Sequence, residues 1–390
     1  MRGLSGTDVR RLDATKSRMN DVKAYWPTME QWQRGEPSDH GFDPLALQRA
    51  ADFAIASESR MNRDIRQALE DGHFAEPPPI NKIVGPIKDR GDPSGVIIRG
   101  GRIVAEWGDV NRVDMTFSAT KSYLSLCAGL AVDDGLIPDI EAPVRDLVDD
   151  GGFDSAQNRS ITWSHLLQLT SEWEGELWDK PDWIDHNRDL SAKPGQLTEK
   201  GNKRALQAPG THWEYNDVRV NRLALALLRV FERPLPEILK ERIMAPIGAS
   251  QTWQWHGYEN SYVEINGQSM QSVSGGAHWG GGLWISTLDH ARVGLLMLNN
   301  GNWNGRQIIS ADWVARSTTP CPLNQNYGLM WWLNAIGEQA PAAPRTSFFA
   351  KGVGANIIWV DPTNDMVCVV RWIDKEQFPE FVAKVLDAIR

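Results

Sequence analysis

The spacing of apolar positions predicts a chain whose two ends carry strands and whose middle is mostly helical. Residues 43–59, DPLALQRAADFAIASES, place apolar side chains along one face of a helix, and Asp43-Pro44 is typical of a helix start. Residues 95–109 contain two short β-rich runs joined by two glycines, which predicts a hairpin. Residues 1–42 are polar and lack clear periodicity, so we expect them to form an N-terminal extension.

The stretch from about 118 to 290 is predicted to be mostly helical, with long loops. Residues 161–175, ITWSHLLQLTSEWEG, predict a helix that ends in a tryptophan-bearing loop. Residues 220–249 predict two helices divided at Arg233-Pro234, because proline interrupts a helix. A glycine-rich loop, GGAHWGGG, is followed by a helix that begins at Thr287.

The C-terminal part returns to strands and closes with a helix. Residues 327–334, 348–362 and 365–373 predict strands, and residues 377–390 predict a helix. Successive strands of this kind favour antiparallel pairing. We therefore expect one domain over 43–390, with a sheet region from about 43–117 and 291–390 and a helical region over about 118–290.

Composition and charge narrow the classes of partner. The chain has 390 residues and a net charge of -9, which argues against nucleic acid as a partner. Its three cysteines are widely spaced and form no Cys-x-x-Cys pair, so neither a zinc site nor a disulfide framework is expected. The polar N-terminus has no apolar core of a signal peptide, and no apolar run is long enough to span a membrane. These features predict a cytoplasmic protein without a membrane partner.

Residues 114–135, DMTFSATKSYLSLCAGLAVDDG, begin like a strand and end like a helix, with Ser118 at the junction. Lys121 lies three residues later, on the same helical face. A helix N-terminus favours a developing oxyanion, and a lysine activates a serine only when its surroundings lower the amine's pKa. The apolar residues that follow favour burial of Lys121. The alternative is an exposed first turn with a serine cap and a solvated lysine.

Several segments in order resemble the penicillin-recognising serine hydrolases. Residues 117–137 are similar to the Ser-x-x-Lys helix of that superfamily, and 160–171, SITWSHLLQLTS, to the helix that follows it. Residues 209–227, beginning PGTHWEYND, resemble the segment with the second catalytic motif. Residues 280–310, 327–333 and 348–362 resemble later landmarks. The resemblance covers roughly 43–390 and includes class C β-lactamases, DD-peptidases, family VIII carboxylesterases and 6-aminohexanoate-dimer hydrolases.

This resemblance implies a fold and an activity. The fold would be α/β plus all-α, β-lactamase/DD-peptidase-like, with an antiparallel sheet flanked by helices and a helical subdomain. The activity would be cleavage of a small-molecule ester or amide through an acyl-enzyme, carboxylesterase-like and without metal or organic cofactor. One alternative is an amide-specific hydrolase, such as an oligoamide hydrolase, a peptidase or a β-lactamase. Another is a non-catalytic binding protein that retains the fold.

The resemblance also implies roles for individual residues. Ser118 would be the nucleophile and Lys121 its base or hydrogen-bonding partner, while Tyr215 would relay protons to the leaving group. The oxyanion would be bound by the backbone N–H groups of Ser118 and Val353, because backbone donors are fixed before charge develops.

Two departures from the family's motifs bear on the substrate. Asp217 stands where an asparagine is usual, beside Tyr215, and is expected to border the substrate. Gly352 keeps its place in the third motif, but Ala350 stands where a lysine is usual. Lys351 is displaced by one position, which on a strand turns a side chain to the opposite face. Because that lysine position helps to bind substrate carboxylates in relatives, its loss predicts poor turnover of β-lactams.

Other side chains are candidates for substrate contact. Trp173, Trp178 and Trp183 follow the helix at 161–170, and His278 lies in the glycine-rich loop, where a structural role is an equal alternative. Trp331 and Trp332 are adjacent on one strand, so only one of them should face substrate; Trp331 is taken as the contact.

An acidic segment between these candidates has the residue types of a metal site. It contains Asp182, Asp185, His186 and Asp189. Nothing in the spacing fixes a metal geometry, and the chemistry implied above needs no metal. We therefore expect a solvated loop there.

Overall fold

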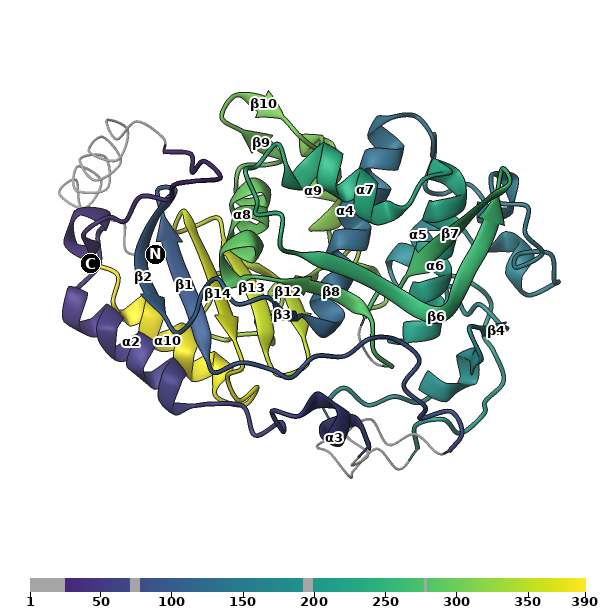
Figure 1. The fold of residues 1–390 in the computed structure, drawn as a ribbon, viewed down its shortest axis with the longest axis horizontal. Coiled ribbons are helices and arrows are strands. Elements are labelled where there is room, and N and C mark those ends of the chain that lie inside the picture. Colours follow the sequence, from purple (N-terminus) through teal and green to yellow (C-terminus); the bar gives the residue numbers. More distant parts are fainter. Residues whose placement is uncertain (1–24, 71–77, 192–198, 277–278) are drawn as a thin grey trace, which may run out of the picture.

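A six-stranded antiparallel sheet is built from both ends of the chain (Figure 1). The computed structural model describes residues 25–70, 78–191, 199–276 and 279–390. The strand order is β11-β12-β13-β14-β1-β2, with neighbouring strands antiparallel throughout. The strands are β1 (Ser94–Arg99), β2 (Arg102–Trp107), β11 (Trp332–Leu333), β12 (Phe348–Gly352), β13 (Asn356–Asp361) and β14 (Met366–Arg371).

The β1–β2 hairpin turns at Gly100 and Gly101, as predicted. Both glycines have positive φ, 57° and 75°, a conformation that glycine adopts without strain. The segment before helix α2 (Pro44–Ala56) packs on this hairpin: the Gly35 N–H donates to the Ile103 carbonyl, and the Trp32 indole N–H donates to the Gly101 carbonyl. The described part of the predicted N-terminal extension therefore lies against the body of the protein.

Helices cover both faces of this sheet (Figure 1). Helices α2 (Pro44–Ala56) and α10 (Phe378–Asp387) lie on one face, and α8 (Thr287–Leu298) lies on the other. Side chains alternate accordingly along β13, where Ile357 belongs to the core beside α10 and Ile358 to the core beside α8. Because both faces are covered, β13 and β14 are buried at every position.

The middle of the chain packs helices around α4 (Thr120–Asp133). Helix α4 is buried on nearly all sides, and it contacts α6 (Asp217–Phe231) on one side and β12 on the other. A helix buried in this way must be apolar around most of its circumference. The shorter helices are α3 (Ile65–Glu70), α5 (Trp163–Leu167), α7 (Leu235–Leu239), α9 (Ala311–Ser317), the π-helix Lys240–Met244, and the 3₁₀ turns Pro37–His40, Phe117–Ala119, Val144–Asp146, Asn158–Ser160 and Asp182–Asp185.

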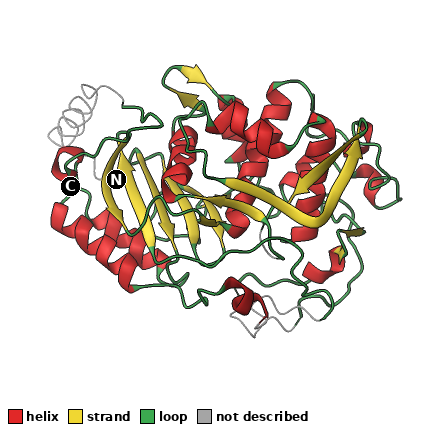
Figure 2. Cartoon of the chain, viewed as in Figure 1, coloured by secondary structure: helices red, strands yellow, loops and turns green. Residues whose placement is uncertain are grey.

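Most of a second sheet lies within the region that we predicted to be helical (Figure 2). Its order is β3-β8-β6-β7, and it includes a long hairpin that lies beside α6. The hairpin turns at Asn266-Gly267, with φ of 52° and 74°, and Asn-Gly is a strong hairpin signal that our sequence prediction overlooked. The strands are β3 (Asp114–Met115), β6 (Gln254–Ile265), β7 (Gln268–Val273) and β8 (Gly282–Ile285), and two small ribbons add β4 (Glu176–Leu177), β5 (Lys180–Pro181), β9 (Asn302–Trp303) and β10 (Arg306–Gln307).

Two predicted elements are shorter than their sequence patterns suggested. The helix expected over 161–175 ends at Leu167, because the backbone turns left-handed at Leu169 and Glu172 (φ of 60° and 49°). The strand expected over 327–334 is only β11, since Met330 also has positive φ. None of the helices in the described ranges combines the length and the apolar character needed to cross a membrane.

Candidate active site

Ser118 lies on a tight turn between β3 and α4. The turn is the 3₁₀ segment Phe117–Ala119, and Phe117 has φ of 50°, which is unusual for an aromatic residue. The Phe117 ring packs edge-on against Trp372 at 6.3 Å, so core contacts hold this backbone in place. The turn leaves Ser118 partly exposed among buried neighbours, at the N-terminus of α4.

The Lys121 amine is directed at Ser118. Its Nζ donates a hydrogen bond to Ser118 Oγ at 2.9 Å, and its side chain is only 2% exposed. Gly276, from the glycine-rich loop, leaves room for this pair, because a Cβ there would lie 2.7 Å from Lys121 Nζ and 3.4 Å from Ser118 Oγ. The alternative of an exposed first turn with a solvated lysine is therefore wrong.

Asp217 lies against the same amine. Its Oδ1 is 2.6 Å from Lys121 Nζ, and its Oδ2 is 2.9 Å from Arg188 Nη1. Burial lowers the pKa of Lys121, but the Asp217 carboxylate and Tyr215 outweigh burial, so the pKa of the amine is raised above its ordinary value. Lys121 is therefore protonated at rest, with Asp217 as its counter-ion. Arg188, which no sequence pattern indicated, completes this group.

Tyr215 is buried beside the two cations. Lys121 Nζ lies 4.8 Å and the Arg188 guanidinium carbon 5.3 Å from the centre of its ring. The ring stacks on Trp332, with 5.8 Å between ring centres. Trp331 is instead fully buried against Phe348, so the choice of Trp331 as the tryptophan facing substrate is wrong. Trp332, the first residue of β11, is the tryptophan that lies beside Tyr215.

The end of β12 meets the Ser118 turn. A Cβ at Gly352 would lie 2.0 Å from the Thr116 carbonyl and 3.1 Å from the Ala119 nitrogen, so only glycine fits there. This close approach brings Val353, the next residue, near the nucleophile turn. Ala350 pairs with Ile358 and is fully buried in the core that contains Tyr215.

Lys351 occupies the opposite side of β12 from Ala350, as its register predicts. It pairs with Ile357, whose side chain belongs to the core beside α10. Its Nζ donates to Gln339 Oε1 at 2.8 Å and lies 5.7 Å from the centre of the Trp332 ring. Burial lowers the pKa of this amine to about 8, and the nearby charge of Lys375 adds to the effect.

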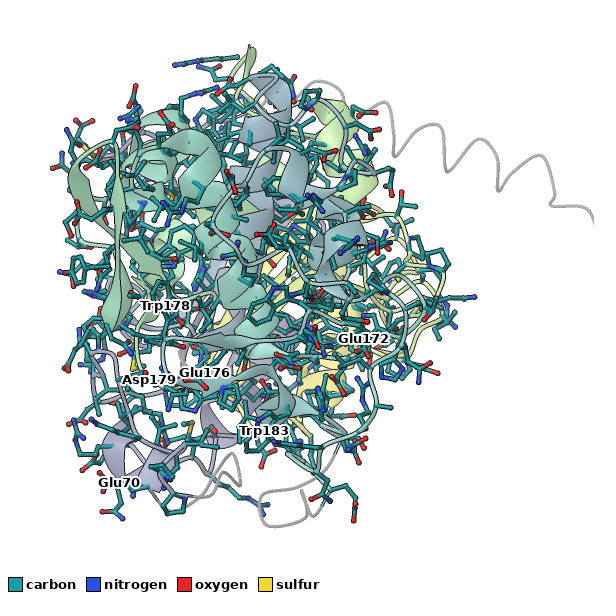
Figure 3. All side chains as sticks on the ribbon, turned by 90° about the vertical axis from the view of Figure 1, so that its right-hand side faces the viewer. Glu70, Glu172, Glu176, Trp178, Asp179 and Trp183 are labelled. Carbon is teal, nitrogen blue, oxygen red and sulfur yellow. The ribbon has the colours of Figure 1, made fainter. Side chains whose placement is uncertain are left out.

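The tryptophans after α5 have packing partners of their own. Trp173 is 4% exposed and its indole N–H donates to the Gly152 carbonyl at 2.7 Å, so the protein itself satisfies its polar atom. Trp178 packs beside the core under the β6–β7 hairpin, at the side of the molecule seen in Figure 3. The Trp183 ring lies 4.8 Å from Lys203 Nζ. His278 lies outside the described residues.

The acidic segment expected to be a solvated loop is largely buried. Asp182, Asp185 and His186 are all less than a tenth exposed, whereas Asp189 is exposed. Burying a carboxylate is unfavourable unless it is paired, and the two buried carboxylates, Asp182 and Asp185, each have a partner here. Asp185 accepts the Asp217 backbone N–H at 2.8 Å, and Asp182 contacts His186 at 3.1 Å. Within the described part of the chain, no cluster of three or more metal-ligating side chains is present.

A second ion cluster ties this loop region to α6. Glu172 is fully buried and accepts two hydrogen bonds from Arg204 and one from Arg219, each at 2.7 Å. Burial raises the pKa of Glu172, but these hydrogen bonds and charges outweigh it and bring the pKa down to about 2. The folded state therefore holds this carboxylate ionised.

Replacing Glu172 with glutamine is expected to destabilise the protein by about 3 kcal/mol or more at pH 7, because it leaves buried arginines short of a counter-ion. Because the pKa of Glu172 is lower in the folded state than in the unfolded state, ionised Glu172 stabilises the folded protein fully at pH values above the unfolded pKa of 4.5. This stabilisation is lost as the pH falls from 4.5 toward the folded-state pKa of about 2. Urea unfolding at pH 7, 4.5 and 3 should therefore show a shallower acid loss in the variant than in the wild type.

Glu176→Gln is the matched control, since Glu176 is an exposed glutamate only four residues away (Figure 3). It should change the free energy of unfolding by no more than about 0.5 kcal/mol. Equal losses in the two variants would contradict the assignment of Glu172 as the buried anchor.

Comparison with known proteins agrees with this architecture. The family model described as Beta-lactamase matches residues 87–384. A protein of Escherichia coli O157:H7 described as a candidate D-alanyl-D-alanine carboxypeptidase is 26% identical over 215 residues, which cover 46% of this chain and 49% of that protein. A protein of Salmonella enteritidis PT4 with the same description is 22% identical over 196 residues, which cover 42% of this chain and 45% of that protein. The chain spans about half the length of the curated relatives it matches.

Solved structures share the fold at low identity. A penicillin-binding protein homologue from Caulobacter crescentus has a TM-score of 0.58 and 15% identity, covering 91% of this chain and 99% of its own. A candidate 6-aminohexanoate-dimer hydrolase from Bacillus anthracis has a TM-score of 0.52 and 16% identity, and the match covers 94% of this chain and 87% of that protein. A family VIII carboxylesterase has a TM-score of 0.54 and 16% identity, and the match covers 88% of this chain and 96% of that protein. The predicted fold class is thus confirmed, and the chain belongs to the Beta-lactamase family.

Proposed function

We propose that this protein is a serine hydrolase that cleaves an ester or amide bond of a small molecule through an acyl-enzyme on Ser118, with a carboxylesterase-like preference. The observation that carries the proposal is the hydrogen bond from the buried Lys121 amine to Ser118 Oγ at 2.9 Å, at the start of a helix. A serine needs such a partner to lose its proton on attack.

The proposed reaction has two halves. Ser118 Oγ attacks the substrate carbonyl while its proton passes to neutral Lys121, and the N–H groups of Ser118 and Val353 bind the oxyanion. Collapse expels the alcohol or amine, which takes a proton relayed through Tyr215. Water then attacks the acyl-enzyme and loses a proton to neutral Lys121, and the acid leaves as that proton is returned to Ser118 Oγ. Because Asp217 favours the protonated form of Lys121, the rate should rise with pH through neutrality and into the alkaline range.

Uncharged esters are expected to be better substrates than β-lactams. Ala350 offers only a methyl group where relatives place a lysine, and Lys351 extends from the opposite side of the strand. A charge-assisted hydrogen bond contributes about 1.5–3 kcal/mol, so its absence corresponds to roughly 10–100-fold. We expect kcat/KM for p-nitrophenyl butyrate to exceed that for benzylpenicillin or nitrocefin by at least that factor.

The Lys351→Ala variant tests the strand register that underlies this expectation. It should change ester hydrolysis by less than about threefold, since the amine is hydrogen-bonded to Gln339 and makes no contact with Ser118 or Lys121 that would serve the reaction. Efficient penicillin turnover that is abolished by Lys351→Ala would contradict the substrate argument.

Amide hydrolysis is the alternative activity, favoured by the names of relatives that include a D-alanyl-D-alanine carboxypeptidase and a 6-aminohexanoate-dimer hydrolase. A panel of matched p-nitrophenyl esters and p-nitroanilides separates the two. A fluorophosphonate probe tests catalysis of either kind, and absence of label and turnover would instead favour a non-catalytic binding protein. The proposed location remains cytoplasmic, in keeping with three buried, unpaired cysteines.

A further inference from the structure

Arg188 is a buried cation next to the Ser118–Lys121 pair that none of the sequence motifs includes. Its side chain is 8% exposed, and its Nη1 lies 2.9 Å from Asp217 Oδ2 and 3.4 Å from Asp185 Oδ1. Its guanidinium also faces the Tyr215 ring. One side chain from the loop before α6 therefore contacts both residues that surround the Lys121 amine.

Asp217 is held from three directions. Its Oδ1 meets Lys121 and its Oδ2 meets Arg188, while its backbone N–H donates to Asp185 Oδ2 at 2.8 Å. Asp185 is itself fixed by Lys200, whose Nζ lies 3.3 Å from Asp185 Oδ1. The orientation of the carboxylate that meets Lys121 thus depends on the loop that carries Arg188.

The charges around Lys121 explain why a second cation matters there. Asp217 from α6, Tyr215 from the segment before α6 and Arg188 from the loop face the amine, and Ser118 is its partner on its own helix. A carboxylate paired with Lys121 alone would hold the proton on the amine strongly in a buried site. Arg188 offsets part of that negative charge and repels the lysine proton.

We propose that Arg188 is a positioning residue for the hydrolysis proposed above: it orients Asp217 and offsets its charge, so that the Lys121 amine stays directed at Ser118 and can release its proton. Arg188 acts through Asp217 and Lys121 and forms no bond with the substrate carbonyl. The expected effect of Arg188 on kcat rests on the proposed function. Its role in placing Asp217 and Lys121 rests only on the contacts described above.

The test is a double-substitution cycle on purified protein with p-nitrophenyl butyrate. Arg188→Met should lower kcat by about 10–100-fold at pH 7 with KM within about twofold, since Asp217 then acts on Lys121 unopposed. Adding Asp217→Asn to Arg188→Met should raise kcat at least about fivefold over the single variant, because the uncompensated carboxylate is removed. Arg188→Lys, which keeps the charge, should stay within about threefold of wild type.

Arg204→Met is the matched control. Arg204 binds Glu172 and Glu214 in the neighbouring ion cluster, so its loss should lower the melting temperature and leave kcat of the folded enzyme within about twofold. An Arg188→Met variant with wild-type kcat would overturn the inference. A further loss on adding Asp217→Asn would also overturn it, because a merely structural arginine predicts that result.

Two measurements separate this inference from the proposed function. If wild-type protein neither takes the fluorophosphonate label nor turns over esters, the proposed function fails. A crystal structure of Arg188→Met then still decides the placement role. Displacement of Lys121 Nζ beyond hydrogen-bond distance of Ser118 Oγ would support that role, and an unchanged Ser118–Lys121–Asp217 arrangement would refute it.

Discussion

Ser118→Ala should abolish hydrolysis of every substrate that the protein accepts, with kcat reduced by at least about 10³-fold. The Oγ atom is the one that Lys121 contacts at 2.9 Å, and alanine offers no atom for attack. The fold should persist, since the turn is held by Phe117, Thr116 and Gly352 rather than by the hydroxyl. Steady-state kinetics on p-nitrophenyl butyrate, with the fluorophosphonate label as a second readout, measure both effects.

Ser122→Ala is the matched control for that variant. Ser122 is a buried hydroxyl on the next turn of the same helix, and it donates to the Met330 carbonyl at 2.8 Å. Its loss should destabilise the fold by about 1 kcal/mol and leave kcat nearly unchanged. If Ser118→Ala keeps a tenth of the wild-type kcat, the nucleophile has been assigned to the wrong residue.

Lys121→Arg should lower kcat by at least about 10²-fold, as removal of a general base does. Arginine keeps the positive charge beside Asp217 but does not deprotonate in proteins. In the wild type, the rate should increase with pH because Asp217 raises the pKa of Lys121, so that only a small fraction of the amine is neutral near pH 7. The arginine variant should lose most of that increase, which a pH–rate profile from 6 to 10 would show.

Lys180→Arg controls for the bulk of arginine at a buried lysine. Lys180 is also buried, and its amine donates to the carbonyls of Ile80 and Lys82. It should retain the wild-type pH profile. Near-normal rates for Lys121→Arg would mean that the reaction needs only a fixed positive charge beside Ser118.

The parts of the site that could be predicted from sequence depend on local geometry. Ser118 and Lys121 lie one helical turn apart, so their contact follows from helix periodicity once the helix start is identified. The opposite orientations of Ala350 and Lys351 follow from strand alternation in the same way. Asp217 and Tyr215 are about a hundred residues away, and only the resemblance to a known family assigned them to the site; the pairing of Asp217 with Lys121 was not predicted.

The parts that could not be predicted depend on long-range packing. Arg188 lies in a charged segment without periodicity, and such a segment is typical of a solvated loop unless its counter-ions are known. Trp331 and Trp332 could not be distinguished, because the strand begins only at Trp332 and the sequence does not show which face of it is turned toward Tyr215. The β6–β7 hairpin was missed for a simpler reason, since its Asn266-Gly267 turn was visible in the sequence.

The strand order of the main sheet has a consequence for how the chain folds during synthesis. Strand β1 pairs with β2 on one edge and with β14 on the other, so Val96 faces Val369 across more than 270 residues of sequence. Until β14 leaves the ribosome, the β1 edge is an apolar template that can pair with other chains. Pairing over such a separation is slow, because the loop must close before any contact forms. Helix α4 therefore gains its contact with β12, which completes the surroundings of the Ser118 turn, only after more than 200 further residues have been synthesised.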